Sequence, residues 1–133
     1  MDRFDGERRP VLVVEADPLR AEELRECLML LNIPARLVMT EEELLSAIRR
    51  DVFGRAIVAA ELDVGDEPAA ARVAALPSIR CLVVVGDGED AEATARQCGA
   101  TVYLPRPVTA ESLAWALRPA LATADAPQRI SMN

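Results

Sequence analysis

Short apolar runs alternate along this chain with segments of helical period. The runs are rich in β-branched residues and contain few polar positions, which is typical of strands buried on both faces of a sheet. They predict five strands, at residues 11–14, 36–39, 55–60, 81–85 and 101–104. The intervening periodicity predicts five helices, at about residues 18–31, 41–50, 68–76, 89–98 and 110–121.

Helix-boundary residues support this alternation. Asp17 and Pro18 suit the N-cap and first position of a helix, Thr40 and Glu43 have the spacing of a capping box, and Gly99 suits a helix end. Strands that alternate with helices demand parallel pairing, with helices on both faces. We therefore expect an α/β fold, a doubly wound five-stranded parallel sheet in a single domain at residues 10–121. Residues 1–9 would form an N-terminal arm, and residues 122–133 a tail or the start of a linker.

Composition narrows the possible chemistry. The formal net charge is −7, all 15 basic residues are Arg, and the chain contains no His. The absence of Lys and His excludes Schiff-base lysines, Ser-His-Asp triads and His-containing zinc sites. A GC-rich genome would explain much of the preference for Arg over Lys. The acidic balance argues against direct contact of this domain with nucleic acid.

Three scattered cysteines, Cys27, Cys81 and Cys98, suit small core positions rather than a disulfide framework. The first ten residues are polar, unlike a secretory signal, and no apolar run is long enough to span a membrane. We expect a cytoplasmic protein with no membrane contact.

The predicted strand ends carry the candidate chemistry. Glu15, Ala16 and Asp17 follow the first strand, Glu61 and Asp63 the third, Gly86 the fourth, and Arg106 the fifth. Functional sites of parallel sheets lie at the edge where the carboxyl ends of the strands meet. The acids could hold a divalent ion, or they could close into an ion-pair network centred on Arg106. The sequence contains neither of the common glycine-rich phosphate-binding motifs.

Three segments at these strand ends, VLVVEADP, AIVAAELDVG and GATVYLPRPV, carry a family resemblance. In order and spacing they resemble the receiver domains of bacterial two-component response regulators, over roughly residues 10–121. The resemblance implies the (βα)5 flavodoxin-like receiver fold. It also implies that Glu61 occupies the position of the phosphoacceptor. Glu15 and Ala16 occupy the positions of the family's acid pair, and Tyr103 that of its switch aromatic.

Every position that carries the family's chemistry is changed. Glu61 stands for the phosphoacceptor Asp, Ala16 for a metal-binding acid, Gly86 for a Thr or Ser, and Arg106 for a Lys. Ala16 supplies no oxygen to Mg²⁺, and a Glu is one methylene longer than an Asp. We therefore predict a degenerate pseudo-receiver with no catalytic residues, no enzyme activity, no cofactor and no Mg²⁺ site.

The replacements favour a specific pairing. Arg106 prefers a bidentate carboxylate, so it could pair with Glu61 and hold the pocket permanently in one state. The alternative is that both residues have drifted in an unused site. Tyr103 either lies permanently inward, where Gly86 leaves room for it, or sits half-buried at a strand edge with a solvated hydroxyl.

Candidate interface residues lie on the last predicted helix. Leu113, Ala114, Leu117 and Leu121 form its expected core stripe, which places Glu111, Trp115 and Arg118 on the opposite face. An exposed Trp is typical of an interface, although its ring could instead pack over a neighbouring helix. Met29 and Leu30 lie off the core stripe of the first helix, so they offer a second surface unless they widen its buried face.

The sequence thus predicts a phosphorylation-independent protein–protein interaction domain in two-component-type signalling or transcription control. The resemblance implies a histidine kinase, a phosphotransfer protein or an output domain as partner. It also implies a homodimer through the face of the fourth helix, fifth strand and fifth helix. Two alternatives stay open: a receiver still phosphorylated at Glu61, and a sensor of a nucleotide or second messenger. For such a sensor, Arg8–Arg9 and Arg49–Arg50 are the Arg clusters that could hold phosphates.

Overall fold

Five parallel strands form the central sheet, in the order β2–β1–β3–β6–β7. The structure is a computed structural model, and it describes residues 9–118. The strands are β1 (Val11–Val14), β2 (Ala35–Val38), β3 (Arg55–Ala59), β6 (Cys81–Gly86) and β7 (Val102–Pro105). Chain order reverses direction across the sheet at β1, which lies between β2 and β3. The predicted doubly wound α/β fold is confirmed.

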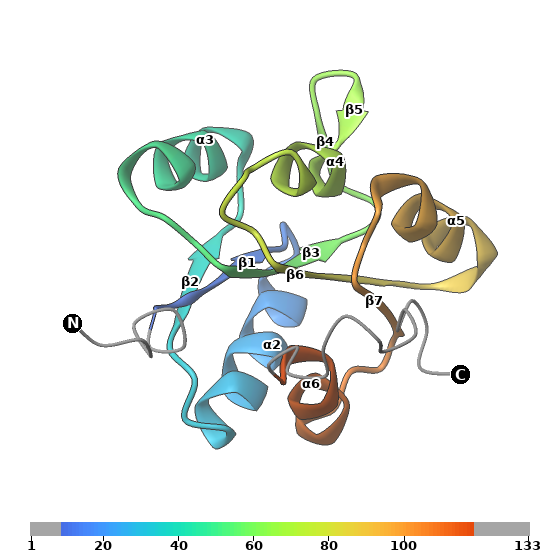
Figure 1. Ribbon diagram of the computed structural model, residues 1–133. Coiled ribbons are helices and arrows are strands. Elements are labelled where there is room, and N and C mark those ends of the chain that lie inside the picture. The colour runs from blue at the N-terminus through green and yellow to red at the C-terminus, as the bar shows by residue number, and fades with distance from the viewer. Residues whose placement is uncertain (1–8, 119–133) are drawn as a thin grey trace.

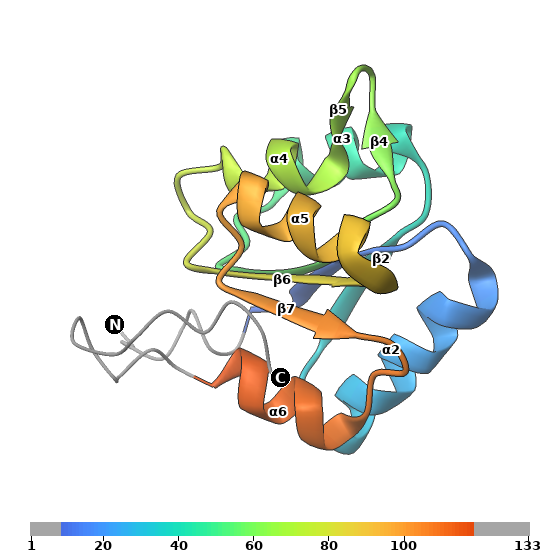
Figure 2. The same ribbon diagram turned by 90° about the vertical axis from the view of Figure 1, so that its right-hand side faces the viewer.

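Helices cover both faces of this sheet. On one face lie α2 (Pro18–Leu30) and α6 (Ala110–Leu117) (Figure 1). On the other lie α3 (Glu41–Arg50), α4 (Ala69–Ala74) and α5 (Gly88–Cys98) (Figures 1 and 2). A small antiparallel hairpin of β4 (Asp63–Val64) and β5 (Glu67–Pro68) stands beside α4, where the sequence analysis expected only a loop. In the described residues, no helix combines the length and apolar character needed to cross a membrane.

Each face of the sheet has its own hydrophobic core, because successive strand residues point to opposite faces. In β6, Leu82 and Val84 belong to the cluster under α3, α4 and α5, whereas Val83 and Val85 belong to the cluster over α2 and α6. Phe53, just before β3, is among the largest fully buried side chains of the first cluster. The inner strands β1, β3 and β6 are therefore buried on both sides, as their apolar residues predict, whereas the edge strand β2 is only partly buried.

The helix caps agree with the sequence at two helices and differ at a third. Asp17 accepts from the Leu19 amide at 3.0 Å, and at α6 Thr109 and Ser112 form a reciprocal capping box. Thr40 caps α3 by accepting from the Glu43 amide at 3.1 Å. The carboxylate of Glu43, however, accepts from the Met39 amide at 2.6 Å, not from the amide of Thr40. The long Glu side chain reaches one residue beyond the N-cap.

The core stripe of α6 differs from the prediction. Leu113, Ala116 and Leu117 are buried, whereas Ala114 is exposed. This spacing of three and four residues turns Ala114 about 100° away from Leu113. The predicted stripe residue Leu121 lies outside the described residues.

Gly86, at the end of β6, allows a close approach of α5 to the sheet. A methyl group built on Gly86 would overlap Cβ of Ala91 in α5 and would lie 3.1 Å from Cβ of Ala60. Gly86 and Ala91 are both buried. Any larger residue at position 86 must push α5 outward.

We predict that Gly86→Ala lowers the free energy of unfolding by about 1–3 kcal/mol, because the added methyl group overpacks a filled contact. Urea unfolding followed by circular dichroism measures the loss. Gly54→Ala is the matched control, since a Cβ there meets nothing within 4 Å. Equal stability of the two variants would show that α5 is not held against β6 by this contact.

Candidate functional site

The carboxyl ends of four strands meet at one edge of the sheet, and each is followed by a charged residue. Glu15 follows β1, Glu61 lies two residues after β3, and Asp87 and Arg106 follow β6 and β7 directly. In Figure 2 these strand ends come together on the right, between α5 and the start of α2. Parallel pairing thus gathers three acids and one Arg from distant parts of the sequence.

Arg106 contacts all three carboxylates. Its Nη2 donates to Glu61 Oε2 at 2.8 Å and to Glu15 Oε1 at 3.2 Å, and its Nη1 donates to Asp87 Oδ2 at 2.9 Å. A longer bond of 3.5 Å runs from Nη1 to Glu61 Oε1, so the Arg106–Glu61 pair is bidentate. The strand-end pair considered from the sequence is present, with two further acids around it.

Glu15 is the deepest member of this network. It is only 2% exposed, and it is the one charged residue that is buried among residues 9–118. Arg106 binds its Oε1, while its Oε2 accepts from the Asp17 amide at 3.1 Å. Both carboxylate oxygens are therefore satisfied, which a buried charge requires. Removal of Arg106 would leave this charge buried without a cation.

The guanidinium of Arg106 is held firmly in its charged form. Burial by itself would lower the pKa of Arg106, but hydrogen bonds to Glu61 and Asp87 and the charges of Glu61 and Glu15 outweigh burial and raise it. The peptide bond between Arg106 and Pro107 is cis. The Arg106 amide donates to the Gly86 carbonyl at 3.0 Å, which ties the loop after β7 to the end of β6.

A second Arg extends the network to α2. Arg20 Nη1 donates to Glu61 Oε2 at 3.0 Å, and Arg20 Nε lies 3.7 Å from Asp17 Oδ2. Glu61 thus lies between two guanidinium groups. Sequence reasoning missed Arg20 and Asp87 as members of the site. Their positions in the sequence could have indicated both. Arg20 lies in the first turn of the helix after β1, and Asp87 directly follows Gly86.

Two other candidate residues from the sequence stay outside the network. Ala16 is exposed and offers only a methyl group. Asp63 lies in β4, is exposed, and makes no ion pair with the described residues. The β4–β5 hairpin carries Asp63 away from the sheet edge. Tertiary structure therefore separates it from Glu61, its neighbour in sequence.

Tyr103, in β7, lies inward. It is 3% exposed, belongs to the hydrophobic cluster under α5, and donates its hydroxyl to the Gly88 carbonyl at 3.4 Å. Burial raises the pKa of this phenol, and the charges of Glu92 and Asp87 raise it further. The alternative of a half-buried ring with a solvated hydroxyl is wrong, because the hydroxyl reaches the first turn of α5.

Two cavities flank the ion pairs, one of about 300 Å³ and one of about 380 Å³. Arg20, Asp87 and Arg106 line both cavities. The first extends toward Val108 in the loop before α6, and the second toward Ala91 in α5. The ion pairs therefore lie between the two cavities and fill the centre of the strand-end pocket.

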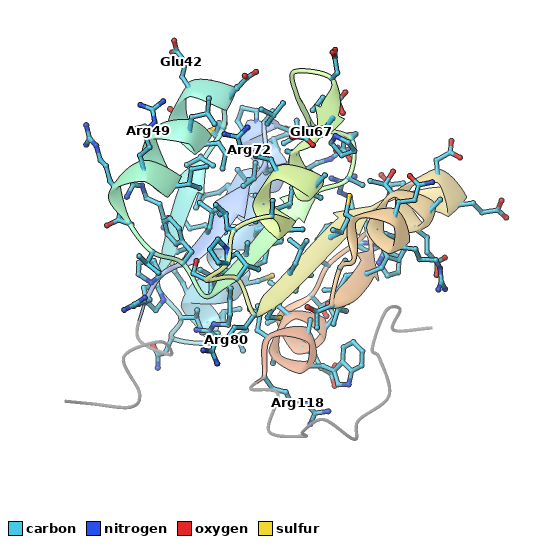
Figure 3. All side chains as sticks on the ribbon, turned by 45° about the horizontal axis from the view of Figure 1, so that its top comes forward. Glu42, Arg49, Glu67, Arg72, Arg80 and Arg118 are labelled. Carbon is cyan, nitrogen blue, oxygen red and sulfur yellow. The ribbon has the colours of Figure 1, made fainter. Side chains whose placement is uncertain are left out.

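The candidate interface residues of α6 lie partly as expected. Glu111 and Arg118 are exposed, and Figure 3 shows Arg118 at the end of the helix. Trp115 was predicted to point to solvent, and that prediction is wrong. Its ring is half-buried and packs against the cluster beneath the sheet, because a large indole can reach back to the core from the side of a helix.

The two other predicted surfaces lie elsewhere. Arg49 and Arg50 are exposed at the end of α3, at the sheet edge opposite the site (Figure 3 labels Arg49). Arg8 lies outside the described residues. Met29 and Leu30 are 59% and 78% exposed, so the alternative that they widen the buried face of α2 is wrong.

No protein-family model matches the sequence, and no curated protein matches it. Solved structures do match. A putative response regulator from Chloroflexus aurantiacus J-10-fl is similar with a TM-score of 0.72 and 22% identity, over 86% of this chain and 100% of that one. The signal receiver domain of an HD domain-containing protein from Pseudomonas fluorescens Pf-5 is similar with a TM-score of 0.71 and 25% identity, over 86% and 96%.

A third similar structure is a response regulator protein from Burkholderia pseudomallei with a phosphorylated aspartic acid and a calcium ion. Its TM-score is 0.67 at 22% identity, and the match covers 83% of this chain but only 66% of that one. All three neighbours share the strand-and-helix arrangement described above. The chain therefore has the fold of response regulator receiver domains.

Proposed function

We propose that this protein is a pseudo-receiver, a phosphorylation-independent protein-interaction domain of two-component-type signalling. One observation carries the proposal. The guanidinium of Arg106, bound to Glu15, Glu61 and Asp87, fills the pocket in which the receiver family performs phosphoryl transfer.

The residues present do not fit the Mg²⁺ ion that receivers use. Ala16 stands where the family has a metal-binding acid, and its methyl group supplies no ligand. The carboxylates of Glu15 and Glu61 already direct oxygens to Arg106, at 3.2 and 2.8 Å. Mg²⁺ demands near-ideal octahedral oxygen geometry. A divalent ion would therefore have to displace the guanidinium of Arg106, and it would still lack one ligand.

The pocket is also poorly suited to an anionic group. Both guanidinium groups, of Arg20 and Arg106, are engaged by carboxylates. Gly86 supplies no hydroxyl, and the contact of α5 with β6 leaves no space for a side chain at that position. A phosphoryl group on Glu61, or the phosphate of a nucleotide, would face Glu15 and Asp87 without a free cation. These charges favour the interaction domain over the sensor and over a phosphorylated receiver.

The buried Tyr103 supports a surface held in one state. In the receiver family, the aromatic at this position turns inward when the acceptor is phosphorylated. Here Tyr103 is inward beneath α5, and Gly86 lets α5 close over it without any phosphoryl group. We infer that the face of α5, β7 and α6 is presented permanently to a partner or to a second copy. Glu111 and Arg118 are its exposed charges.

We predict that Arg106→Ala lowers the free energy of unfolding by about 3 kcal/mol, because Glu15 stays buried without its cation. Urea unfolding measures the change. Arg36→Ala is the matched control: Arg36 pairs with Asp51 at 3.0 Å with both side chains substantially exposed, and its loss should cost less than about 1 kcal/mol. Equal losses would indicate that the pocket is an unused site with drifted residues.

We further predict that a small phosphodonor with Mg²⁺ leaves the intact mass of the protein unchanged. Ala16 removes one of the metal ligands that the reaction requires, and Gly86 removes the hydroxyl. A receiver known to autophosphorylate serves as the control for the donor. A gain of one phosphoryl group that disappears in Glu61→Gln would overturn the proposed function.

A further inference from the structure

The helices α3, α4 and α5, on one face of the sheet, carry opposite charges at their two ends. Each follows the carboxyl end of a strand and runs back toward the edge where the strands begin, so their amino ends lie on one side and their carboxyl ends on the other. We call the exposed acids on the first side the acidic rim: Glu41, Glu42, Asp66, Glu67, Glu89 and Asp90. We call the exposed arginines toward the other side the basic rim: Arg49, Arg50, Arg72 and Arg80. Figure 3 labels members of both rims, with Glu42 and Arg49 toward the two ends of α3.

The rim charges are not compensated within the described part of the chain. No side chain of either rim makes a hydrogen bond or an ion pair with residues 9–118. By contrast, two neighbouring arginines are engaged: Arg96 binds Glu92 at 3.2 Å, and Arg36 binds Asp51 at 3.0 Å. Each rim therefore offers exposed charge of a single sign to another molecule.

Helix dipoles explain only part of this arrangement. Acids in the first turn and arginines in the last turn stabilise a helix, which accounts for the charges at the two ends of α3. This effect falls off beyond the terminal turns. Arg80 lies six residues after the end of α4, and Asp66 lies three residues before its start. These two residues extend the charged rims beyond what helix stability requires.

We propose that copies of this chain associate head to tail, with the basic rim of one copy against the acidic rim of the next. A shift of one copy along the axis of α3 brings the arginines at the end of that helix toward the acids at the start of the same helix in its neighbour. Both rims are built by the same helix layer, so the opposite charges face each other across the same width. Such a contact is heterologous, and each pair of copies leaves one rim of each kind free to bind a further copy.

The two rims favour this occupant over others. Two copies that met through the same rim would set like charges against each other. A single-stranded nucleic acid needs exposed aromatic rings on which its bases stack, and in the described residues Phe53 and Tyr103 are buried and Trp115 is half-buried. An anionic lipid surface would engage the basic rim and leave the acidic rim without a counterpart. A second copy satisfies both rims at once.

The formal net charge of −7 does not prevent this contact. Exposed charges farther apart than about 8 Å are largely screened at physiological salt, so the repulsion between whole molecules is damped. Paired rim charges would lie within about 4 Å of each other, where screening is weaker. Because a single exposed ion pair contributes little, we expect weak association that depends on several pairs together.

This inference goes beyond the proposed function and does not depend on it. The phosphodonor and Arg106 experiments report on Arg106 and Glu61, and neither residue belongs to a rim. Association through the face of α5, β7 and α6 would involve other charges, those of Glu111 and Arg118. Either idea can therefore fail while the other stands.

The test is sedimentation equilibrium of the natural chain and of two rim variants at low salt, up to millimolar concentration. The weight-average mass of the natural chain should rise above 14.4 kDa with concentration and return to that value at about 1 M salt, where the Debye length is about 3 Å. Arg49→Glu/Arg80→Glu reverses the basic rim, and Glu42→Arg/Glu67→Arg reverses the acidic rim. Each variant alone should associate at least about tenfold more weakly, because its two rims then carry like charges.

An equimolar mixture of the two variants guards against misfolding. One variant has two acidic rims and the other has two basic rims, so the mixture should regain the association of the natural chain. Attraction between net charges would not explain this recovery, because each substitution changes the net charge of −7 by two and both variants stay negative. The matched control Glu22→Arg/Glu26→Arg makes the same change in net charge as the acidic-rim variant, on α2 at the other face of the sheet, and should associate as the natural chain does.

The inference is overturned if the natural chain stays monomeric at low salt, or if the mixture associates no more than the separate variants. It is also overturned if the control loses association as the rim variants do, since net charge would then be the cause. A single-stranded oligonucleotide or phosphatidylglycerol vesicles that bind the natural chain, but not Arg49→Glu/Arg80→Glu, would assign the basic rim to that occupant and overturn the inference as well.

Discussion

The guanidinium of Arg106 is the interaction on which the strand-end pocket depends. A parallel sheet brings the loops after β1, β3, β6 and β7 to one edge, and in this chain three of those loops carry a carboxylate that contacts Arg106. Without a cation between them, these like charges would repel, and Glu15 would be a buried charge with no cation to balance it. Because Arg106 contacts Glu15, Glu61 and Asp87 at once, it links the carboxyl ends of four strands that are far apart in the sequence.

A packing constraint beside this network works in the same direction. Gly86 lets Ala91 approach β6 so closely that no side chain fits at position 86, and Tyr103 fills the space beneath α5. The Tyr103 hydroxyl then reaches the Gly88 carbonyl in the first turn of α5. Electrostatics thus close the pocket while packing fixes the helix above it. Both support a domain whose partner surface does not await a chemical signal.

Residues of α2 belong to the same site. Arg20 shares Glu61 with Arg106, and Glu23 lines one of the two cavities beside these ion pairs. The helix after β1 therefore adds its own charges to those that the strand ends bring together.

Periodicity and composition were enough to predict the strands, the helices and the parallel sheet, because burial on both faces leaves a strong pattern of apolar runs. The order of strand ends also pointed to Arg106 and Glu61 before any geometry was known. Only the tertiary structure decided that Asp87 and Arg20 contact this pair and that Asp63 does not. The reason is that these contacts depend on how the chain turns after each strand. The tertiary structure also decided that the ring of Trp115 packs against the core, that Leu30 remains exposed, and that Gly86 marks a contact with Ala91. Side-chain reach and helix-to-sheet distance are properties of three-dimensional packing, and a one-dimensional pattern does not contain them.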